Sequence, residues 1–213
     1  MKRQLCVTLA LIFSVLCRAG AQEIKPVQLP PPQKEIGKPL MQAIALRHSS
    51  RDFDRKPLPL QELANLLWAG GGVNRQESGK RTAPSAMNWQ ETDIYVILAD
   101  GAYRYEPKSG LLAPVSGGDM RGLAGTQGFV KDAPVNLVYV VDAARMTKGS
   151  DEERTMYGAA DVGFMAENVY LYCASQTLAV VVRGSVDRAR LAEALKLRPD
   201  QKIILCQTVG YAK

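Results

Sequence analysis

The sequence predicts a single domain of mixed helices and strands, α+β or α/β, on three observations. Segments with the spacing of an amphipathic helix and apolar runs typical of strands follow one another in mixed order. Neither an internal repeat nor a composition shift typical of an interdomain linker divides the chain. Its length is ordinary for one domain and sufficient to bury a core.

The first 21 residues have the layout of a secretion signal. Lys2 and Arg3 precede the apolar run LCVTLALIFSVLC, and the small residues Ala19-Gly20-Ala21 follow it, as at a cleavage site. Because the run is short for a membrane span, we expect cleavage and export, to the periplasm of a bacterium. An uncleaved membrane anchor is the alternative.

The remaining chain divides into an arm and a domain. Residues 22–36 contain four prolines, which predict an extended arm that either wraps a partner or is disordered. Residues 37–213 form the expected domain.

Two helices are expected at the start of the domain. The apolar residues of 40–47 recur on one helical face, and a second helix follows Pro57 and Pro59. Four leucines repeat with helical spacing in this second helix until Gly70 ends it. The glycine-rich, charged segment 70–81 is then the best candidate for a mobile lid.

Strands are expected in four places. Residues 93–100 have the pattern of a strand, and residues 102–115 predict a hairpin whose turn is PKSG. Residues 135–143 are apolar enough for a central strand, and residues 202–211 close the chain as another strand.

Two further helices complete the expected order. Residues 153–176 form a long helix that is apolar around most of its circumference, which indicates a core or a subunit interface. A shorter helix spans 186–197, with Ser185 as its N-cap and Asp187 in its first turn. Cys173 and Cys206 both lie in apolar runs, so we interpret them as buried small hydrophobes, a disulfide being the alternative in an exported protein.

Composition excludes several familiar chemistries. Of the 27 lysines and arginines three lie in the signal, so 24 remain against 21 acidic residues, which is too small an excess to favour nucleic acid. One histidine and two cysteines beyond the signal do not make an ordinary zinc site, and no metal is expected. The nucleophile elbow GxSxG, the dinucleotide motif GxGxxG and the phosphate loop GxxxxGK[ST] are all missing. If the protein is an enzyme, a cofactor therefore does the difficult step.

Two short motifs resemble those of a known family. RHSSR at 47–51 fits the element R-x-S-x-R, and PSAMNWQ at 84–90 fits P-S-x-x-N-x-Q, both of the FMN-dependent nitroreductase superfamily. The likeness extends from about Pro39 to Tyr211. It implies an α+β fold, a three-layer α/β/α sandwich in which a mainly antiparallel mixed sheet surrounds a long central helix. The segments RTAPSA and GGDMRGL look most like the branch of dehydrogenases that oxidise thiazolines in peptide maturation.

The resemblance implies a set of residues that bind flavin mononucleotide (FMN). Arg47 and Arg51 would direct guanidinium groups at the phosphate and at the ring's O2, and their charge would stabilise the reduced ring. The Asn88 amide would pair with the donors and acceptors of the ring edge. The implied cofactor-binding residues are Arg47, His48, Ser49, Arg51, Pro84, Ser85, Ala86, Asn88, Gly184, Ser185 and Lys213. The alternatives are two solvated arginines in the first motif and an ordinary turn in the second.

Gly184 and Ser185 would place a backbone N–H near the flavin N5, at the start of the last helix. The family often has basic residues downstream that complete the phosphate site, and Lys213 is the only substitute here. No catalytic side chain beyond the flavin is named. Tyr103, Tyr105 and Arg183 are candidates for contact with substrate.

We therefore expect an exported homodimer with FMN at the subunit interface. It would transfer hydride by a ping-pong route to or from a small organic molecule such as a nitroaromatic, a quinone or a thiazoline. The electron donor or acceptor is unidentified, and neither a nucleic acid nor a stable membrane span is expected. The alternative is a noncatalytic exported protein that binds a flavin or another ligand.

Overall fold

A computed structural model describes residues 23–213, and the secretion signal predicted at 1–21 lies outside these residues. A seven-stranded sheet has the order β1-β6-β5-β4-β7-β9-β8, and each of its pairings is antiparallel. The strands are β1 (Val27–Gln28), β4 (Thr92–Ile97), β5 (Gly101–Glu106), β6 (Leu111–Gly117), β7 (Val135–Asp142), β8 (Leu178–Arg183) and β9 (Gln201–Tyr211). A separate ribbon pairs β2 (Val73–Arg75) with β3 (Lys80–Arg81).

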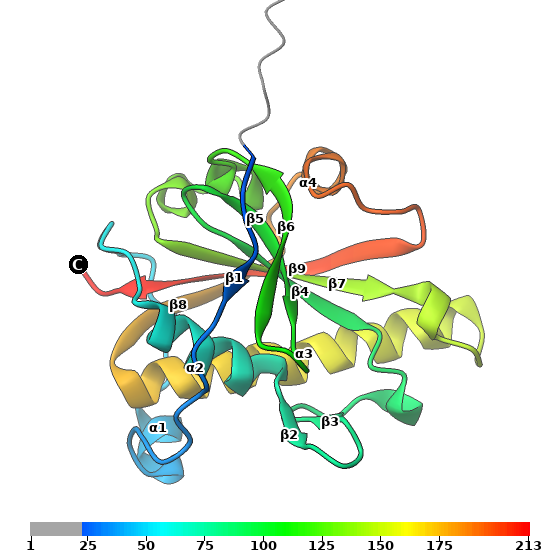
Figure 1. Cartoon of the computed structure of the whole chain (residues 1–213), viewed down its shortest axis with the longest axis horizontal. Helices are drawn as coiled ribbons and strands as arrows, with labels where there is room; N and C mark the ends of the chain where they lie inside the picture. Colours follow the sequence, from blue (N-terminus) through cyan, green and yellow to red (C-terminus); the bar gives the residue numbers. More distant parts are fainter. Residues whose placement is uncertain (1–22) are drawn as a thin grey trace, which may run out of the picture.

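Helices cover both faces of the sheet, which gives three layers (Figure 1). The α-helices are α1 (Leu40–Leu46), α2 (Leu60–Gly71), α3 (Asp151–Gln176) and α4 (Arg188–Ala194). Short 3-10 helices are η1 (Ala86–Asn88), η2 (Arg121–Ala124), η3 (Gly128–Lys131) and η4 (Ala143–Arg145). The α+β architecture that the family resemblance implied is confirmed.

Two apolar clusters separate the layers. The larger cluster packs α2 and α3 on one sheet face, through side chains such as Leu66 and Val169. The smaller cluster packs α4 on the other face, through Leu191 and Val140. Every residue of β7 is buried because this strand lies between β4 and β9 and is covered on both faces, as its mostly apolar sequence predicted.

The long helix α3 begins at a capping box. The Ser150 hydroxyl accepts from the Glu153 N–H, and the Glu153 carboxylate accepts from the Ser150 N–H at 2.8 Å. Three acidic residues in the first turn favour the positive end of the helix dipole. The helix ends where Thr177 adopts a left-handed conformation with φ of 62°.

Several boundaries differ from the sequence-based expectation. Residues 178–183, for which no element was predicted, form the edge strand β8, since this run contains three consecutive β-branched valines and pairs with β9. The predicted lid 70–81 is largely the β2–β3 ribbon. Helix α4 begins after Asp187, whose carboxylate accepts from the Arg190 N–H at 3.1 Å, so Asp187 and not Ser185 is its N-cap.

The proline-rich arm lies extended against its own domain. The Gln61 amide donates to the Pro31 carbonyl at 2.9 Å, and the Gln33 N–H donates to the Asn65 side chain at 2.7 Å, so the arm follows α2. Cys173 and Cys206 are free and buried in different apolar clusters, which confirms their interpretation as core residues. Within residues 23–213, none of the helices has both the length and the apolar character needed to span a membrane.

Candidate functional site

The RHSSR segment covers the open edge of the sheet. It follows α1 and lies beside β8, where the Ser50 N–H donates to the Val180 carbonyl at 2.9 Å. The Tyr170 hydroxyl, from α3, accepts from the Val182 N–H at 2.8 Å and also bonds the Ser49 hydroxyl at 2.8 Å. These bonds satisfy backbone groups that an edge strand would otherwise expose, and they fix the segment between β8 and α3.

The charged side chains of this segment remain accessible. Arg47 and Arg51 are exposed, and the Arg47 guanidinium lies over the Tyr170 ring with its Nε 3.9 Å from the Glu167 carboxylate. An ion pair that long between exposed groups contributes little to stability, so the guanidinium can exchange it for an anion that binds more tightly.

His48 faces a cavity beside the same loop. Its Nδ1 donates to the Leu46 carbonyl at 2.8 Å, which leaves Nε2 free. His48 and Ser50 line a cavity of about 330 Å³ together with Lys38. The structure thus places a small cavity next to the two arginines.

The carboxyl terminus comes to the same place. Ala212 pairs with Phe53, two residues after Arg51, and Lys213 follows Ala212 directly. Lys213 is exposed. A lysine at this end of the chain therefore lies near the segment that the sequence predicted to bind a phosphate.

The PSAMNWQ segment adopts an uncommon backbone conformation. Met87, Asn88 and Gln90 have positive φ angles of 50°, 54° and 50°. Asparagine tolerates this region better than most residues, whereas methionine and glutamine adopt it at a cost. The Asn88 side-chain oxygen accepts from the Gln90 amide at 3.1 Å.

Two buried carboxylates hold this strained segment in place. The Ser85 hydroxyl donates to Glu91 at 3.0 Å, and the Ala86 N–H donates to Asp161 of α3 at 2.8 Å. Glu91 is 0% exposed and Asp161 is 3% exposed. Burial, opposed by the Ala86 N–H and reinforced by the negative charge of Glu91, raises the pKa of Asp161 to about 6.

The sequence reasoning did not identify this carboxylate pair. The available signal was an aspartate in the middle of a mostly apolar helix and a glutamate directly before a buried strand. Both acidic residues stand at positions whose side chains are expected to be buried. A buried acidic side chain is unusual unless another group pairs with it. Their sequence separation of 70 positions hid the partnership.

Within one chain the two motifs line different cavities. The first motif contacts α3 at Tyr170 and the second at Asp161, nine residues earlier, which is about two and a half helical turns. The two contacts therefore lie on opposite flanks of the helix. Among the cavities of residues 23–213 described here, one is lined by His48 and another by Asn88, and none by both.

Between these flanks α3 presents an exposed stripe. Met156 and Phe164 are 57% and 49% exposed, and a Cβ added at Gly163 would meet no atom of the described residues within 4 Å. The stripe consists of Met156, Ala159, Ala160, Gly163, Phe164 and Glu167, all of them exposed. It is mainly apolar and contains small residues, which permit close approach of another surface.

Gly184 and Ser185 lie in the loop between β8 and α4. Both are exposed. The Ser185 carbonyl accepts from the Thr126 N–H at 3.2 Å, and the two hydroxyls are 2.6 Å apart. Because Asp187 is the N-cap and α4 begins at Arg188, these residues precede the start of the helix, where the sequence had placed them.

All three residues predicted to contact substrate are buried, although Tyr105, at 6% exposure, lines a cavity together with Arg81. Tyr103 is buried and donates its hydroxyl to Asp100 at 2.8 Å. Arg183 is 5% exposed and donates to the Ala124 carbonyl at 2.7 Å. Gly125 makes room for it, since a Cβ there would lie 1.9 Å from the Arg183 guanidinium. The expectation that Tyr103 and Arg183 contact substrate is wrong.

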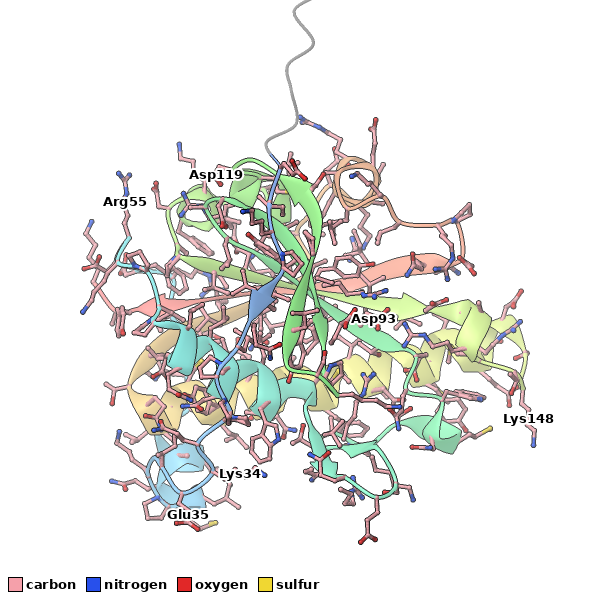
Figure 2. The ribbon with its side chains drawn as sticks, in the orientation of Figure 1. Lys34, Glu35, Arg55, Asp93, Asp119 and Lys148 are labelled. Carbon is pink, nitrogen blue, oxygen red and sulfur yellow. The ribbon has the colours of Figure 1, made fainter. Side chains whose placement is uncertain are left out.

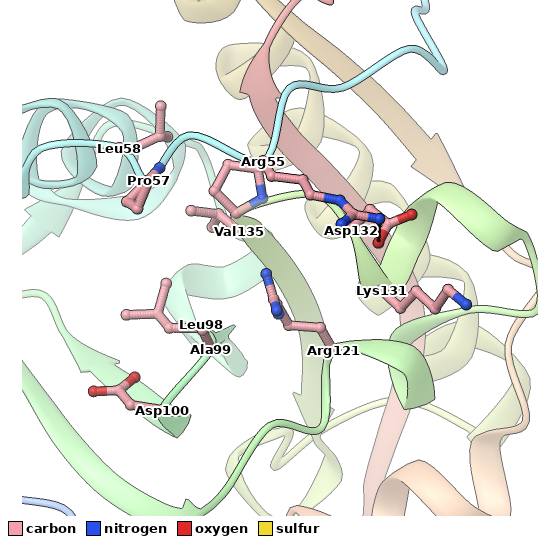
Figure 3. A pocket seen from close by; sticks show the side chains of 11 residues that line it. Arg55, Pro57, Leu58, Leu98, Ala99, Asp100, Arg121, Lys131, Asp132 and Val135 are labelled. Atoms are coloured by element: carbon pink, nitrogen blue, oxygen red, sulfur yellow. Dashed lines mark ion pairs between the residues drawn. The ribbon is translucent and has the colours of Figure 1, made fainter.

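A separate cavity of about 440 Å³ lies where α2 begins (Figure 3). Its apolar wall includes Leu58 and Leu98, and none of the predicted flavin residues lines it. Arg55, on its rim, is 2.8 Å from Asp132. The cavity is thus distinct from both motif segments.

Comparison with known proteins identifies the family. The profile of the nitroreductase family matches residues 44–211, which includes both motifs and all of the sheet except β1. The chain belongs to the nitroreductase family.

Three relatives illustrate the similarity. A nitroreductase-family protein of Methanocaldococcus jannaschii is 31% identical over 162 residues, covering 71% of this chain and 81% of the relative. A crystal structure of a nitroreductase-family protein from Ralstonia eutropha JMP134 is 46% identical, with a TM-score of 0.84 over 88% of this chain and 90% of the other. A Desulfovibrio desulfuricans protein of the same description, solved in complex with FMN, has a TM-score of 0.60 at 22% identity, over 82% and 87%.

Proposed function

We propose that this protein is an FMN-dependent oxidoreductase. One observation carries the proposal: in a chain of the nitroreductase family, the two motifs flank an exposed apolar stripe of the central helix α3. When bound, FMN supplies the two-electron redox chemistry. The chain's own residues bind it, orient it and exclude water.

The RHSSR segment fits the phosphate end of FMN. Among the described residues the exposed cations Arg47 and Arg51 have no short ion pair, and charge-assisted bonds to phosphate are among the strongest polar contacts available to them. Ser49, with His48 beside it, would add neutral hydrogen bonds. Lys213 would contribute a further charge from the carboxyl terminus.

The PSAMNWQ segment fits the ring. The Ala86 N–H is already bonded to Asp161, so the polar contact to the ring edge falls to the Asn88 side chain. Pro84, Ser85 and Ala86 would pack against the ring. The loop that contains Gly184 and Ser185 would present a backbone N–H to the ring from the chain that binds the phosphate.

The site is completed by a second copy of the chain. Because the two motifs lie on opposite flanks of α3, a homodimer that packs stripe against stripe would bring RHSSR of one copy to PSAMNWQ of the other. The small residues of the stripe suit such close packing. Four exposed apolar residues of α1, namely Leu40, Met41, Ile44 and Leu46, would also be covered if the interface extends there.

The sequence supports a proposal for the protein's location and substrate. We infer export on the basis of the amino-terminal signal pattern, and a substrate that is a small organic hydride donor or acceptor. The motif pattern favours the thiazoline-oxidising branch, with nitroaromatics and quinones as further acceptors. The two substrates would use the same face of the ring in turn.

Purified protein lacking residues 1–21 tests the proposal. We expect a yellow protein that binds FMN, loses its colour with a reductant and reduces a nitroaromatic. With 1-benzyl-1,4-dihydronicotinamide as donor, one hydride and one proton convert the nitro group to nitroso and release water. A protein that stays colourless with added FMN would contradict the proposal, and one that binds FMN without turnover would favour the noncatalytic alternative.

A substitution in the stripe tests the dimer. A Cβ at Gly163 meets no atom of the described residues within 4 Å, so Gly163→Arg should leave the fold intact and yield a monomer without FMN. Gly128→Arg is the matched control, because that position is equally open and lies outside the stripe. Sedimentation velocity and FMN absorbance give the two readouts, and a dimeric, FMN-bound Gly163→Arg variant would refute this arrangement.

A further inference from the structure

Two cavities beside the PSAMNWQ segment share part of their lining. One, of about 200 Å³, is lined by Ser85 and Asn88, and the other, of about 440 Å³, reaches the β5–β6 turn at Lys108. Arg81 and Gln90 line both cavities. The anion groove, as we name these two cavities together, therefore starts at the residues proposed to contact the flavin edge and runs away from them.

Cationic side chains dominate the anion groove. Six line it, namely Arg75, Lys80, Arg81, Arg104, Lys108 and Arg145, against two acidic residues, Asp93 and Glu106. Residues 22–213 together carry an excess of only three basic residues. The excess of basic over acidic residues in the groove, six against two, is larger. This concentration is a local property that the mild overall charge conceals.

The acidic residues leave most of these cations unpaired. Arg145 bonds Asp93, and Arg104 is 3.1 Å from Glu106. Within residues 23–213 the other four, Arg75, Lys80, Arg81 and Lys108, have no carboxylate within ion-pair distance. Like charges gathered without counterions repel one another, and an anionic ligand would relieve that repulsion.

Arg81 is the best-placed of the four. It is half-buried, and its Nη1 donates to the Thr92 carbonyl at 2.7 Å, which fixes a side chain that lines both cavities. Burial, together with the nearby charge of Arg145, lowers the pKa of Arg81, while Asp93 and Glu91 oppose this. A partly desolvated guanidinium gains more from an anion than a solvated one, and its planar donors suit phosphate or carboxylate.

We propose that the anion groove binds the charged part of an anionic substrate, carrying phosphate or carboxylate groups, whose other end reaches the flavin beside Asn88. This rests on the proposed function and adds the substrate class to it. Arg81, which lines both cavities, anchors the anion, and Lys80 and Lys108 attract it. The β2–β3 ribbon, which carries Arg75, Lys80 and Arg81, is then a substrate-binding element.

Three acceptors with the same reacting group test the substrate class. These are 4-nitrobenzyl alcohol, 4-nitrobenzyl phosphate and 5-nitroisophthalate, reduced with the uncharged donor 1-benzyl-1,4-dihydronicotinamide. We expect a kcat/KM about tenfold or more higher for the phosphate or the dicarboxylate than for the alcohol. Whichever anion is preferred identifies the charged group, and equal values for all three would overturn the proposal.

Charge-neutral variants locate the effect. Lys80→Gln with Lys108→Gln should remove most of the preference by raising KM for the anion, with the alcohol unaffected. Lys131→Gln with Lys148→Gln is the matched control, since both lysines are exposed outside the groove, and Lys148 projects from one end of the molecule (Figure 2). An equal loss for alcohol and anion would refute a role in recognising charge.

Direct binding separates this inference from the flavin proposal. Calorimetric titration with inorganic pyrophosphate and with citrate needs neither FMN nor turnover. Binding that the Lys80→Gln, Lys108→Gln variant weakens about tenfold supports the groove even in a colourless protein. Absence of binding for both anions, or binding unchanged in that variant, would overturn it.

Discussion

The two motif segments reach the central helix by opposite means. RHSSR has ordinary backbone geometry, is bonded to an edge strand and leaves its charged groups in solvent. PSAMNWQ has three non-glycine residues at positive φ and is hydrogen-bonded to two buried carboxylates. The first segment therefore presents accessible charged side chains on an unstrained backbone. The second has an unusual backbone conformation that depends on the buried groups around it.

This contrast indicates how each segment will respond to mutation. Changes in RHSSR should act mainly on the binding of an anionic cofactor, because its side chains do little for the fold. Changes around PSAMNWQ should act on stability as well, because its conformation depends on buried contacts. The following predictions test that division, beginning with the largest effect.

Loss of both arginines should nearly abolish FMN binding. Arg47→Ala with Arg51→Ala removes two charge-assisted contacts to phosphate, each contributing about 1.5–3 kcal/mol, so the Kd for FMN should rise roughly 100-fold or more. The unfolding free energy should change by less than about 0.5 kcal/mol for each exposed site. Quenching of FMN fluorescence and urea unfolding measure the two quantities.

Arg190→Ala, an exposed arginine on α4, is the control for this pair. It should bind FMN as the parent protein does. If the double variant keeps its affinity, the solvated-arginine alternative is correct and the phosphate lies elsewhere.

Removal of one hydroxyl should reveal how RHSSR is supported. Tyr170→Phe leaves the Val182 N–H without its 2.8 Å acceptor and frees Ser49, so we expect a loss of about 1–3 kcal/mol in unfolding free energy. Tyr157→Phe is the matched control, since its ring packs against Trp89 and its hydroxyl has no partner among the described residues. Equal urea midpoints for the two variants would show that water replaces the Tyr170 bond.

The carboxylate pair should make the support of PSAMNWQ sensitive to pH. Because the pKa of Asp161 rises from 3.8 to about 6 on folding, the native state keeps a proton that the unfolded chain releases. This stabilisation is complete below about pH 4, is lost as the pH rises through 6, and is absent above that. Asp161→Asn should abolish this pH dependence of the unfolding free energy. We expect the parent protein to lose on the order of 1–2 kcal/mol between pH 4 and pH 7 through this group.

Other carboxylates titrate with the opposite sign, since bonds to Arg121 hold the pKa of Asp119 low. The relevant quantity is therefore the difference between the parent and Asp161→Asn in unfolding free energy at pH 4, 5, 6 and 7. A difference that does not vary with pH would mean that the pair shares no proton.

The smallest effect is expected at Asn88. Asn88→Gly keeps the positive φ that the segment needs and removes only the amide, so FMN should bind about fivefold more weakly through loss of roughly one neutral hydrogen bond. Asn88→Ala should cost additional stability because alanine tolerates that φ poorly. Unchanged FMN affinity in Asn88→Gly would support the alternative that this segment is an ordinary turn.

Most of the fold could be predicted from local patterns. The helix over α3, the β5–β6 hairpin and strands β7 and β9 each have a periodicity or an apolar run that indicates one structure. Strand β8 was missed because its run of apolar residues follows a helix directly and has no alternation. The N-cap of α4 was misplaced because Ser185 and Asp187 are equally good capping residues, and tertiary contacts with Thr126 decide between them.

The candidate site was predictable only where a motif marked it. Arg47 and Asn88 stand in short motifs. The Glu91–Asp161 pair and the anion groove, in contrast, consist of residues that the fold brings together from distant positions. Arg183 shows the converse error, because a charged residue next to a candidate loop was expected to contact substrate and is in fact enclosed beside Gly125. Burial of a charge depends on neighbours that a single sequence does not identify.

Complementation between two defective chains tests the central claim most directly. Arg47→Ala, Arg51→Ala chains and Asn88→Gly, Ser85→Ala chains would each have both sites damaged in their own homodimers. If FMN lies between RHSSR of one copy and PSAMNWQ of the other, a mixed dimer contains one intact site, and FMN binding with parental affinity should reappear on mixing. If no high-affinity binding returns although subunits exchange, the two segments do not meet across copies and the proposed site is wrong.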